Sequence, residues 1–418
     1  MLKTRATAVI VTLCFAVVYV LAMVRSCDAF AYVPGYDRCR IPPMGSAFPF
    51  LMIAALPALL LPVRPTAGNG IIWIVYFMHV FGAVAVTPFL PNLTQDAALF
   101  SLFISLSFVA VSWISNLTTV PFVSSGVNFR AFNAAALIVL VGALSFILIR
   151  FPVTFSIPSI YDVYDVRADF IDNIRENAGT IDGDVILISA YSLVPIGAIL
   201  CFLAYKRDKF LALSFFLVSS LLMFSIYSVS AFKSSVFIFV FVLIVYMYIG
   251  DKEPLRRLIL LFLFIPIFAL ALDLSGLHHD SLIHWFRRVF LVPGLNVQFY
   301  LNQFGLFNNV PIQDAPLLIS QIYFETDGSA NAGLYGNGLA RGGLQGILIV
   351  LFICYIIITL ANSIGKRVPL RISISLLFPS AYALSNSSIT AVLLSYGLAV
   401  NFIFLYGLAN SYPAKISR

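Results

Sequence analysis

Long apolar runs separated by short polar turns make up most of the chain. A bilayer core about 30 Å thick needs about 20 apolar residues per helix, since each residue rises about 1.5 Å. Twelve segments fit this requirement: 7–24, 45–63, 70–91, 97–115, 131–149, 185–204, 210–228, 234–249, 257–273, 343–362, 370–386 and 388–408. The pattern predicts an all-α polytopic membrane protein with about 12 transmembrane helices, formed by residues 1–418 as one integral membrane domain.

Two polar stretches, 151–183 and 274–340, are much longer than the other connections. They follow the fifth and ninth spans, so both fall on the same side of the membrane. Within the second stretch, residues 290–304 are apolar and aromatic but are interrupted by Pro293 and Gly294. We expect this segment to re-enter the bilayer or to lie on its surface. The sequence thus predicts two large loops that contain short helices.

Basic residues predict the orientation, because short cytoplasmic loops carry an excess of Lys and Arg. With a cytoplasmic N-terminus, 15 of the 25 Lys and Arg face inward, and an even number of spans brings the C-terminus inside as well. Both large loops then face the periplasm of a bacterial inner membrane. The net charge of +7 mostly reflects this bias, so no nucleic-acid partner is expected.

Composition supports the membrane assignment and suggests one cross-link. A chain that is 61% hydrophobic and 10% charged is not an ordinary soluble domain. Cys27 and Cys39 both lie in the first outward connection, where an oxidising compartment permits a disulfide. The alternative is two free thiols. We predict a disulfide that fixes the loop and takes no part in chemistry.

The first large loop contains a segment with helical periodicity, residues 161–177. At 100° per residue its apolar side chains fall within an arc of about 140°. These are Val163, Val166, Phe170, Ile171 and Ile174. Arg167 points into this arc, and Arg175 lies at its edge beside Tyr164. A charge on a packing face is costly unless an anion meets it. Snorkelling, or pairing with Glu176 or Asp162, is the alternative.

Histidines concentrate in the second large loop, which holds His278, His279 and His284. A histidine near its normal pKa is suited to act as general base on a sugar hydroxyl. The adjacent pair could also bind a metal with Asp280, but no further ligand spacing supports a metal site. The fourth histidine, His79, is alone inside the third span, and we interpret it as a packing residue.

Cations gather on the predicted outward face, in and beside the two loops. Arginine suits diphosphate because its planar fork binds two oxygens and never deprotonates. The candidates are Arg167, Arg175, Arg287, Arg288 and Arg341, with Lys233 at the outer end of the eighth span. Snorkelling at the membrane interface is the alternative for Lys233.

Two further motifs have a structural and a chemical interpretation. Six glycines between Gly328 and Gly343 permit close backbone approach to a ligand. Asp182 and Asp184 form a D-x-D pair, which can hold the metal of a nucleotide sugar. Asp184 directly precedes the sixth span, however, so we favour a role as helix N-cap.

Several segments, in order, resemble the O-antigen polymerases, which polymerise oligosaccharide repeat units in bacterial inner membranes. The resemblance rests on the multi-span layout with two large outward loops and on four segments, most clearly between residues 150 and 365. These are 161–170, Ala231-Phe232-Lys233-Ser234-Ser235, 288–294 and 329–343. An Arg-x10-Gly pattern proposed in some members is absent, because Gly179 lies one residue too far from Arg167.

The resemblance implies a GT-C-like membrane glycosyltransferase without metal or cofactor. It would move a growing glycan from undecaprenyl diphosphate to a sugar hydroxyl of a new lipid-linked repeat unit. The arginines and Lys233 would bind the diphosphates, and one of the loop histidines or Glu325 would be the base. The sugars would meet Tyr164, Tyr323, Asn331 and Tyr335.

The same resemblance implies the partners: lipid-linked oligosaccharides, the bilayer and a possible chain-length regulator. Two alternatives stay open, a flippase or transporter of the same lipid-linked sugars and an O-antigen ligase. A flippase predicts cations buried inside the spans, whereas the spans of this chain are nearly free of them.

Overall fold

The computed structural model describes most of the chain and is helical wherever it has regular structure. The described residues are 1–36, 39–90, 95–118, 120–121, 126, 128–151, 153, 166, 170, 179–275, 286–308, 310–326 and 328–411. No strand occurs in these ranges. The prediction of an all-α protein is confirmed for the described residues.

Nine helical stretches of the described chain are long and apolar enough to cross a membrane. They are Leu2–Ala29, Ala67–Phe89, Asp96–Leu117, Phe129–Arg150, Ile181–Tyr205, Lys209–Ser230, Pro254–Leu274, Gly333–Gly365 and Ile389–Ser411. The other three predicted spans form α2 (Met44–Leu60), α11 (Lys233–Ile249) and α17 (Leu370–Asn386), with 17 residues each. The protein is therefore multi-pass, and a total of twelve spans stays a prediction.

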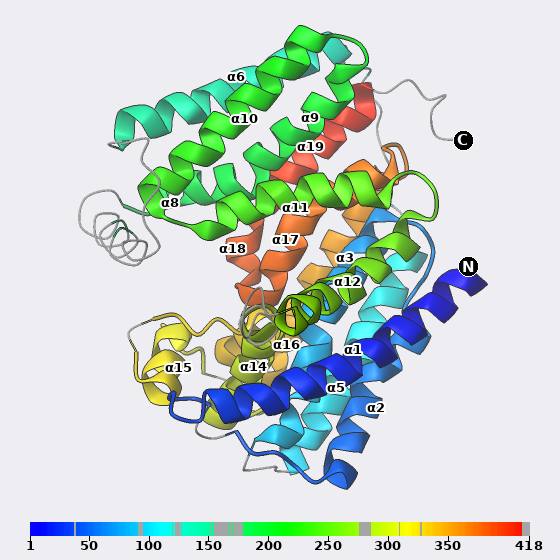
Figure 1. Ribbon diagram of the computed structural model, residues 1–418, viewed down its shortest axis with the longest axis vertical. Helices are drawn as coiled ribbons and strands as arrows, with labels where there is room; N and C mark the ends of the chain where they lie inside the picture. The colour runs from blue at the N-terminus through cyan, green and yellow to red at the C-terminus, as the bar shows by residue number, and fades with distance from the viewer. Residues whose placement is uncertain are drawn as a thin grey trace. The chain divides into compact units, whose positions relative to one another are not determined.

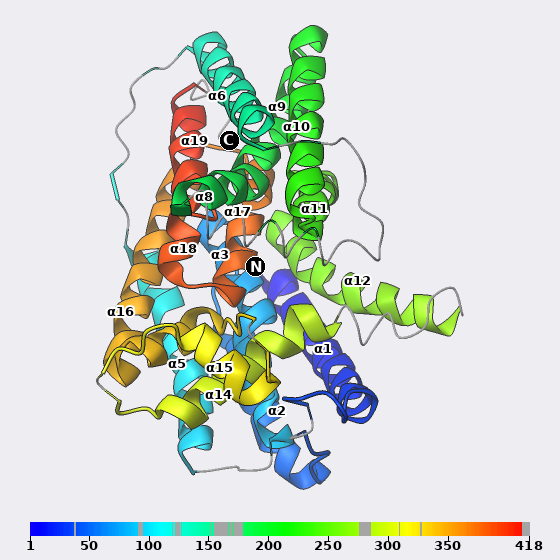
Figure 2. The same cartoon turned by 90° about the vertical axis from the view of Figure 1, so that its left-hand side faces the viewer.

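The chain divides into two compact units. Unit 1 comprises Met1–Val120, Glu253–Asn362 and Ala381–Ile389, and unit 2 comprises Pro121–Lys252, Ser363–Ser380 and Thr390–Arg418. Unit 1 contains α1 (Leu2–Ala29), α2, α5 (Gln95–Leu117) and α12 (Pro254–Leu274), and α1 packs along α12 (Figures 1 and 2).

The span Ala67–Phe89 forms the centre of unit 1, because all of its residues are buried. It consists of α3 (Ala67–Val75), a π-helical turn η1 (Tyr76–Val80), α4 (Phe81–Ala85) and η2 (Thr87–Phe89). Aromatic rings surround it, with Phe15 of α1 5.3 Å from Phe77 and 5.2 Å from Phe81. The apolar run at 70–91 that predicts a span therefore forms the core of this unit.

Asparagines join three spans of unit 1 at the end that the sequence predicts to be cytoplasmic. Gly68 N–H donates to Asn362 Oδ1 over 3.0 Å, and Asn116 Nδ2 donates to Asn69 Oδ1 over 2.8 Å. Asn362 Nδ2 also reaches the carbonyl of Ser115, at 3.4 Å. These bonds join the first turn of the central span to the ends of the helices that contain Asn116 and Asn362.

Part of the second large loop is interior helix and not polar surface. The π-turn η5 (Arg287–Leu291) continues into α14 (Val292–Phe304), which packs on α4. The packing is close, since a methyl group added at Gly294 would come within 2.5 Å of the Gly82 carbonyl oxygen. Of the two expected locations, re-entry fits this packing better than the bilayer surface.

The predicted break at Pro293 and Gly294 is wrong. Proline removes a helical N–H and clashes with the preceding turn, so a break was expected. Here the wider π-turn directly precedes Pro293, which stands in the first turn of α14. Pro195 of unit 2 follows the π-turn η4 (Ser189–Leu193) at the same spacing. In both places the helix axis continues past the proline.

Unit 2 exposes apolar helix faces that suit a lipid environment. Its members include α6 (Phe129–Arg150), α8 (Gly179–Ile188), α9 (Val194–Tyr205) and α10 (Lys209–Ser230), followed later by α18 (Ile389–Leu393) and α19 (Leu398–Ser411). On α6, Ile138 is 71% exposed and Ile149 is 87% exposed. In water such faces would favour aggregation, and in a bilayer they meet lipid tails.

Candidate functional site

Arg287 is held against aromatic rings in unit 1. Its guanidinium carbon lies 4.0 Å from the centre of the Phe30 ring and 5.4 Å from the centre of the Tyr36 ring. The flanking residues anchor its turn, since Phe286 and Phe290 pack 5.7 Å and 5.2 Å from Phe15. Cations within about 6 Å of a ring face are attracted by the ring quadrupole. We call Arg287, Phe30 and Tyr36 the arginine cradle.

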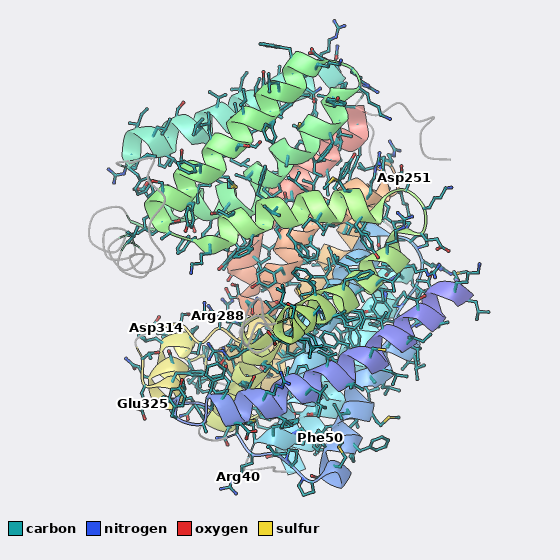
Figure 3. The ribbon with its side chains drawn as sticks, viewed as in Figure 1. Arg40, Phe50, Asp251, Arg288, Asp314 and Glu325 are labelled. Carbon is teal, nitrogen blue, oxygen red and sulfur yellow. A yellow bond between two sulfur atoms is a disulfide. The ribbon has the colours of Figure 1, made fainter. Side chains whose placement is uncertain are left out.

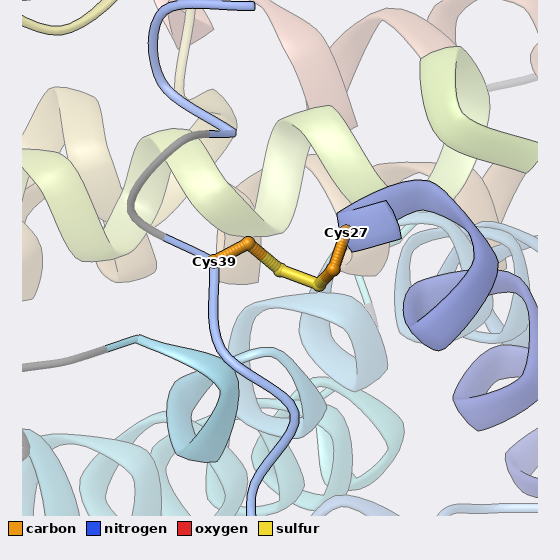
Figure 4. Close-up of a disulfide and its surroundings, with 2 residues drawn as sticks. All are labelled: Cys27 and Cys39. Carbon is orange, nitrogen blue, oxygen red and sulfur yellow. A yellow bond between two sulfur atoms is a disulfide. The ribbon is translucent and has the colours of Figure 1, made fainter. Parts of the chain in front are cut away.

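A disulfide closes the loop that supplies both rings of the arginine cradle. Cys27, at the end of α1, is bonded to Cys39, twelve residues further along the chain (Figure 4). Backbone bonds order the enclosed loop, with Tyr36 N–H donating to the Val33 carbonyl and Cys39 N–H to the Tyr36 carbonyl. Arg40 N–H then donates to the Phe89 carbonyl at the end of the central span, over 2.8 Å.

The charge of Arg287 in the arginine cradle faces aromatic rings and not carboxylates. Among the described residues no carboxylate pairs with Arg287, and its buried Nε has no hydrogen-bond partner. Burial raises the pKa of Tyr36 to about 12, against the opposing effect of the Arg287 and Arg288 charges. The phenol therefore stays neutral and does not offset the charge of the guanidinium.

The other predicted cations of the described chain are exposed. Arg288, on the same π-turn as Arg287, and Arg341 both face outward from unit 1 (Figure 3 labels Arg288). In unit 2, Lys233 is the first residue of α11. A cation at a helix N-terminus opposes the helix dipole, and an anion bound there would relieve that repulsion. Arg167 and Arg175 lie outside the described residues.

The predicted sugar-binding residues of unit 1 are mostly interior. Tyr323 is 4% exposed, stacks 4.2 Å from the Phe299 ring and accepts a hydrogen bond from Asn302 Nδ2. Tyr335 is fully buried, and its hydroxyl donates to the Ile104 carbonyl over 3.0 Å. Only Asn331 is partly exposed. Tyr335 thus packs the core, contrary to an open sugar-stacking position, and Tyr164 lies outside the described residues.

The candidate bases are only partly described. His278, His279 and His284 lie outside the described residues. Glu325 is exposed and ends α15 (Ala315–Phe324) in a left-handed conformation with φ 53°, while Asp314 precedes the same helix (Figure 3). The α15 helix packs on α14, so Glu325 belongs to the same unit as the arginine cradle.

The glycine-rich run serves packing, which corrects the expectation of ligand contact. α16 (Gly333–Gly365) is kinked at Gly342 and Gly343, both with positive φ, so that Gly333–Arg341 forms a separate half-helix. A methyl group at Gly338 would come within 2.7 Å of Ile347 Cα, and one at Gly343 within 2.7 Å of the Asn308 carbonyl oxygen. Gly338 thus lets the half-helix lie against its own continuation, and Gly343 lets the kink approach the segment that follows α14.

The D-x-D pair lies inside a helix, in α8 (Gly179–Ile188). α8 begins at Gly179, five residues before Asp184, so the predicted N-cap at Asp184 is wrong. Asp182 accepts from Arg150 Nε over 2.7 Å, which joins the end of α6 to the first turn of α8. Among the described residues no group of three His, Cys, Asp or Glu could hold a metal ion.

Phe170 of the first large loop packs as its periodicity predicts. Phe170, on the predicted apolar arc, is 6% exposed. Its ring lies 5.9 Å from Phe151 and 5.6 Å from Phe232, the residue before Lys233. Phe170 thus joins an aromatic cluster of unit 2 beside the start of α11.

Sequence reasoning missed the rings of the cradle and did not foresee the hydrogen-bonding state of His79. The sequence feature that could have indicated Phe30 and Tyr36 is their position between Cys27 and Cys39. His79 is buried, but neither ring nitrogen has a hydrogen-bond partner among the described residues. The sequence feature that could have singled out His79 is that it lies in a predicted span without any charged residue.

Comparison of the chain with protein-family models, curated proteins and solved structures finds no match. The candidate site therefore rests on residues and geometry alone.

Proposed function

We propose that the protein is a membrane glycosyltransferase that polymerises lipid-linked oligosaccharide repeat units, the activity that its resemblance to O-antigen polymerases implies. The observation that supports the proposal best is the arginine cradle. Arg287 is fixed by Phe30 and Tyr36 and has no carboxylate partner among the described residues. Such an arginine is a receptor for an anion, and a polyprenyl diphosphate supplies one within a bilayer.

In the proposed reaction, a sugar hydroxyl of the incoming repeat unit attacks the anomeric carbon of the growing glycan. The bond between that carbon and the diphosphate oxygen breaks, and undecaprenyl diphosphate leaves with the bonding electrons. The hydroxyl proton passes to a base, either a loop histidine or Glu325. Arg287, with Arg288 in support, neutralises the charge that develops on the diphosphate, which lowers the barrier without a metal.

The proposal includes the finer features that the resemblance implies. These are twelve spans in a GT-C-like arrangement, both termini in the cytoplasm of a bacterial inner membrane, and a periplasmic site. Arg167, Arg175, Lys233 and Arg341 would bind further diphosphate oxygens, and Asn331 and Tyr323 would border the sugars. A chain-length regulator would be the protein partner.

The test is reconstitution of the purified protein with lipid-linked repeat units, followed by separation of the glycans by length. We expect ladders of longer glycans, and a loss of about 10²–10³ in initial rate for Arg287→Ala, as for other single donors to a developing anion. Arg40→Ala is the matched control, because Arg40 is an exposed arginine just after the same loop.

The outcomes separate the candidate functions. Transfer of the lipid across the bilayer without ladders would replace the polymerase by a flippase. Transfer of one finished glycan to a lipid A–core acceptor would indicate a ligase. Full ladder formation by Arg287→Ala would remove the arginine cradle from the site.

A further inference from the structure

A histidine in the middle of unit 1 makes no hydrogen bond to any described residue. His79 is fully buried, on the π-turn η1 near the midpoint of the central span. Among the described residues neither Nδ1 nor Nε2 makes a hydrogen bond. An unpaired buried polar group is costly, and ionisable residues inside membrane spans commonly mark functional positions.

Two more buried polar atoms of unit 1 lack partners, one turn apart on α14. They are Asn296 Oδ1 and the Tyr300 hydroxyl, for which no donor or acceptor is found in the described chain. The other end of the Asn296 amide is fixed, because Nδ2 donates to the Asn331 carbonyl over 2.7 Å. The amide is therefore oriented, and its free oxygen is an acceptor in the interior.

The three side chains lie near the start of the half-helix Gly333–Arg341, two of them beside its glycines and the third bonded just before it. A methyl group added at Gly333 would come within 2.7 Å of His79 Cε1, and one added at Gly336 within 3.4 Å of the Tyr300 ring. Gly333 and Gly336 are three residues apart, so they share a helix face. Asn296 bonds to the residue two before Gly333. The half-helix N-terminus adds backbone N–H groups that have no intrahelical acceptor.

The His79 ring is fixed in plane by stacking, and its two nitrogens make no hydrogen bond to the described residues. Tyr335 stacks on it at a centroid distance of 5.9 Å and an interplanar angle of 19°. The Tyr335 ring is itself held by its hydroxyl, which donates to the Ile104 carbonyl. A small apolar cavity lined partly by Val75, Leu334 and Leu384 adjoins this segment, so packing around it is incomplete.

The chemistry of these groups selects a neutral ligand. Neutral imidazole offers one donor and one acceptor, the amide oxygen accepts, and the phenol does both. A diphosphate would need a cation here, and no cluster that could hold a metal occurs among the described residues. We propose that His79, Asn296 and Tyr300 form an interior binding site for a hydroxyl group. That hydroxyl comes either from an internal water or from a substrate sugar, and only the sugar source rests on the proposed function.

Magnetic resonance on ¹⁵N-histidine-labelled protein in lipid nanodiscs tests the site without an activity assay. The His79 signal is the one lost in His79→Leu. We expect a cross-peak between the His79 ring and water in the ligand-free protein. If ¹³C-labelled lipid-linked oligosaccharide replaces that cross-peak with one to the glycan, the hydroxyl comes from the sugar. If the water cross-peak persists, the ligand is water. A His79 ring without a cross-peak in either condition would overturn the proposal.

Two variants of α14 provide the matched comparison. Asn296→Leu removes the free acceptor and should weaken the His79 cross-peak at least several-fold. Gln298→Met is the control, because Gln298 is equally buried but its amide already donates to the Ala83 carbonyl and to Thr87 Oγ1. Thermal melting of both variants establishes that they fold. An unchanged cross-peak in folded Asn296→Leu would exclude Asn296 from the site.

Discussion

Arg287 owes its position to residues that lie far from it in sequence. A guanidinium over two rings gains about 0.5–2 kcal/mol, depending on how far it is desolvated. That gain holds the side chain in place without neutralising its charge, whereas a carboxylate would neutralise it. An arginine in a structural ion pair, such as Arg150 with Asp182, therefore differs from an arginine that can bind an external anion.

Phe30→Leu should weaken the cradle, because it removes the ring closest to Arg287. We expect a fall in the melting temperature and at least a several-fold weaker affinity for inorganic diphosphate, measured by calorimetry in detergent. Tyr32→Leu is the control, since Tyr32 is 82% exposed in the same loop. Equal diphosphate affinity in both variants and the parent protein would show that the cradle does not set the anion site.

At the scale of elements, the disulfide is the device that fixes the cradle loop. Closing a loop of this length typically stabilises a protein by about 2–4 kcal/mol. Cys27→Ser with Cys39→Ser should therefore lower the melting temperature and weaken diphosphate binding as Phe30→Leu does. Reductant should shift the parent protein in the same direction and leave the double variant unchanged. A reductant-sensitive double variant would point to another cause.

The crossing of α14 and α4 depends on two glycines. Gly294→Ala places a methyl group against the backbone of Gly82, and overpacking of this kind costs about 1–3 kcal/mol. Gly142→Ala of α6 is the matched control, because nothing lies within 4 Å of its added methyl group. We expect a lower melting temperature for the first variant and an unchanged or higher one for the second. Equal melting temperatures would argue against the close crossing.

For the whole molecule, the orientation can be tested by labelling. Asp314→Cys should react with an impermeant maleimide in intact spheroplasts, and Lys366→Cys only after lysis. The parent protein is the control, since its free cysteines are in the spans and the other two form the disulfide. The reverse labelling pattern would invert the predicted topology and place the candidate site on the cytoplasmic side.

Apolar run length determined the helices, because membrane thickness imposes one length requirement on every span. The positions of the spans also indicated the disulfide, because they place Cys27 and Cys39 together in the first connection between spans. The same reasoning failed at Pro293, where a π-turn accommodates the ring, and at Asp184, where the helix begins earlier. In both places the local backbone geometry depends on tertiary packing, which the pattern of one segment does not show.

The sequence by itself determined an all-helical, multi-pass chain, because hydrophobicity and helix length act along each segment separately. Only the tertiary structure decided that residues 290–301 are interior, that Gly333 and Gly338 pack closely on the protein, and that His79 makes no hydrogen bond to any described residue. Each of these depends on which segments meet, and contacts between distant segments leave no periodic signal in either one. Arg287 shows the difference most clearly, since its charge is evident in the sequence while Phe30 and Tyr36 reach it only through the fold.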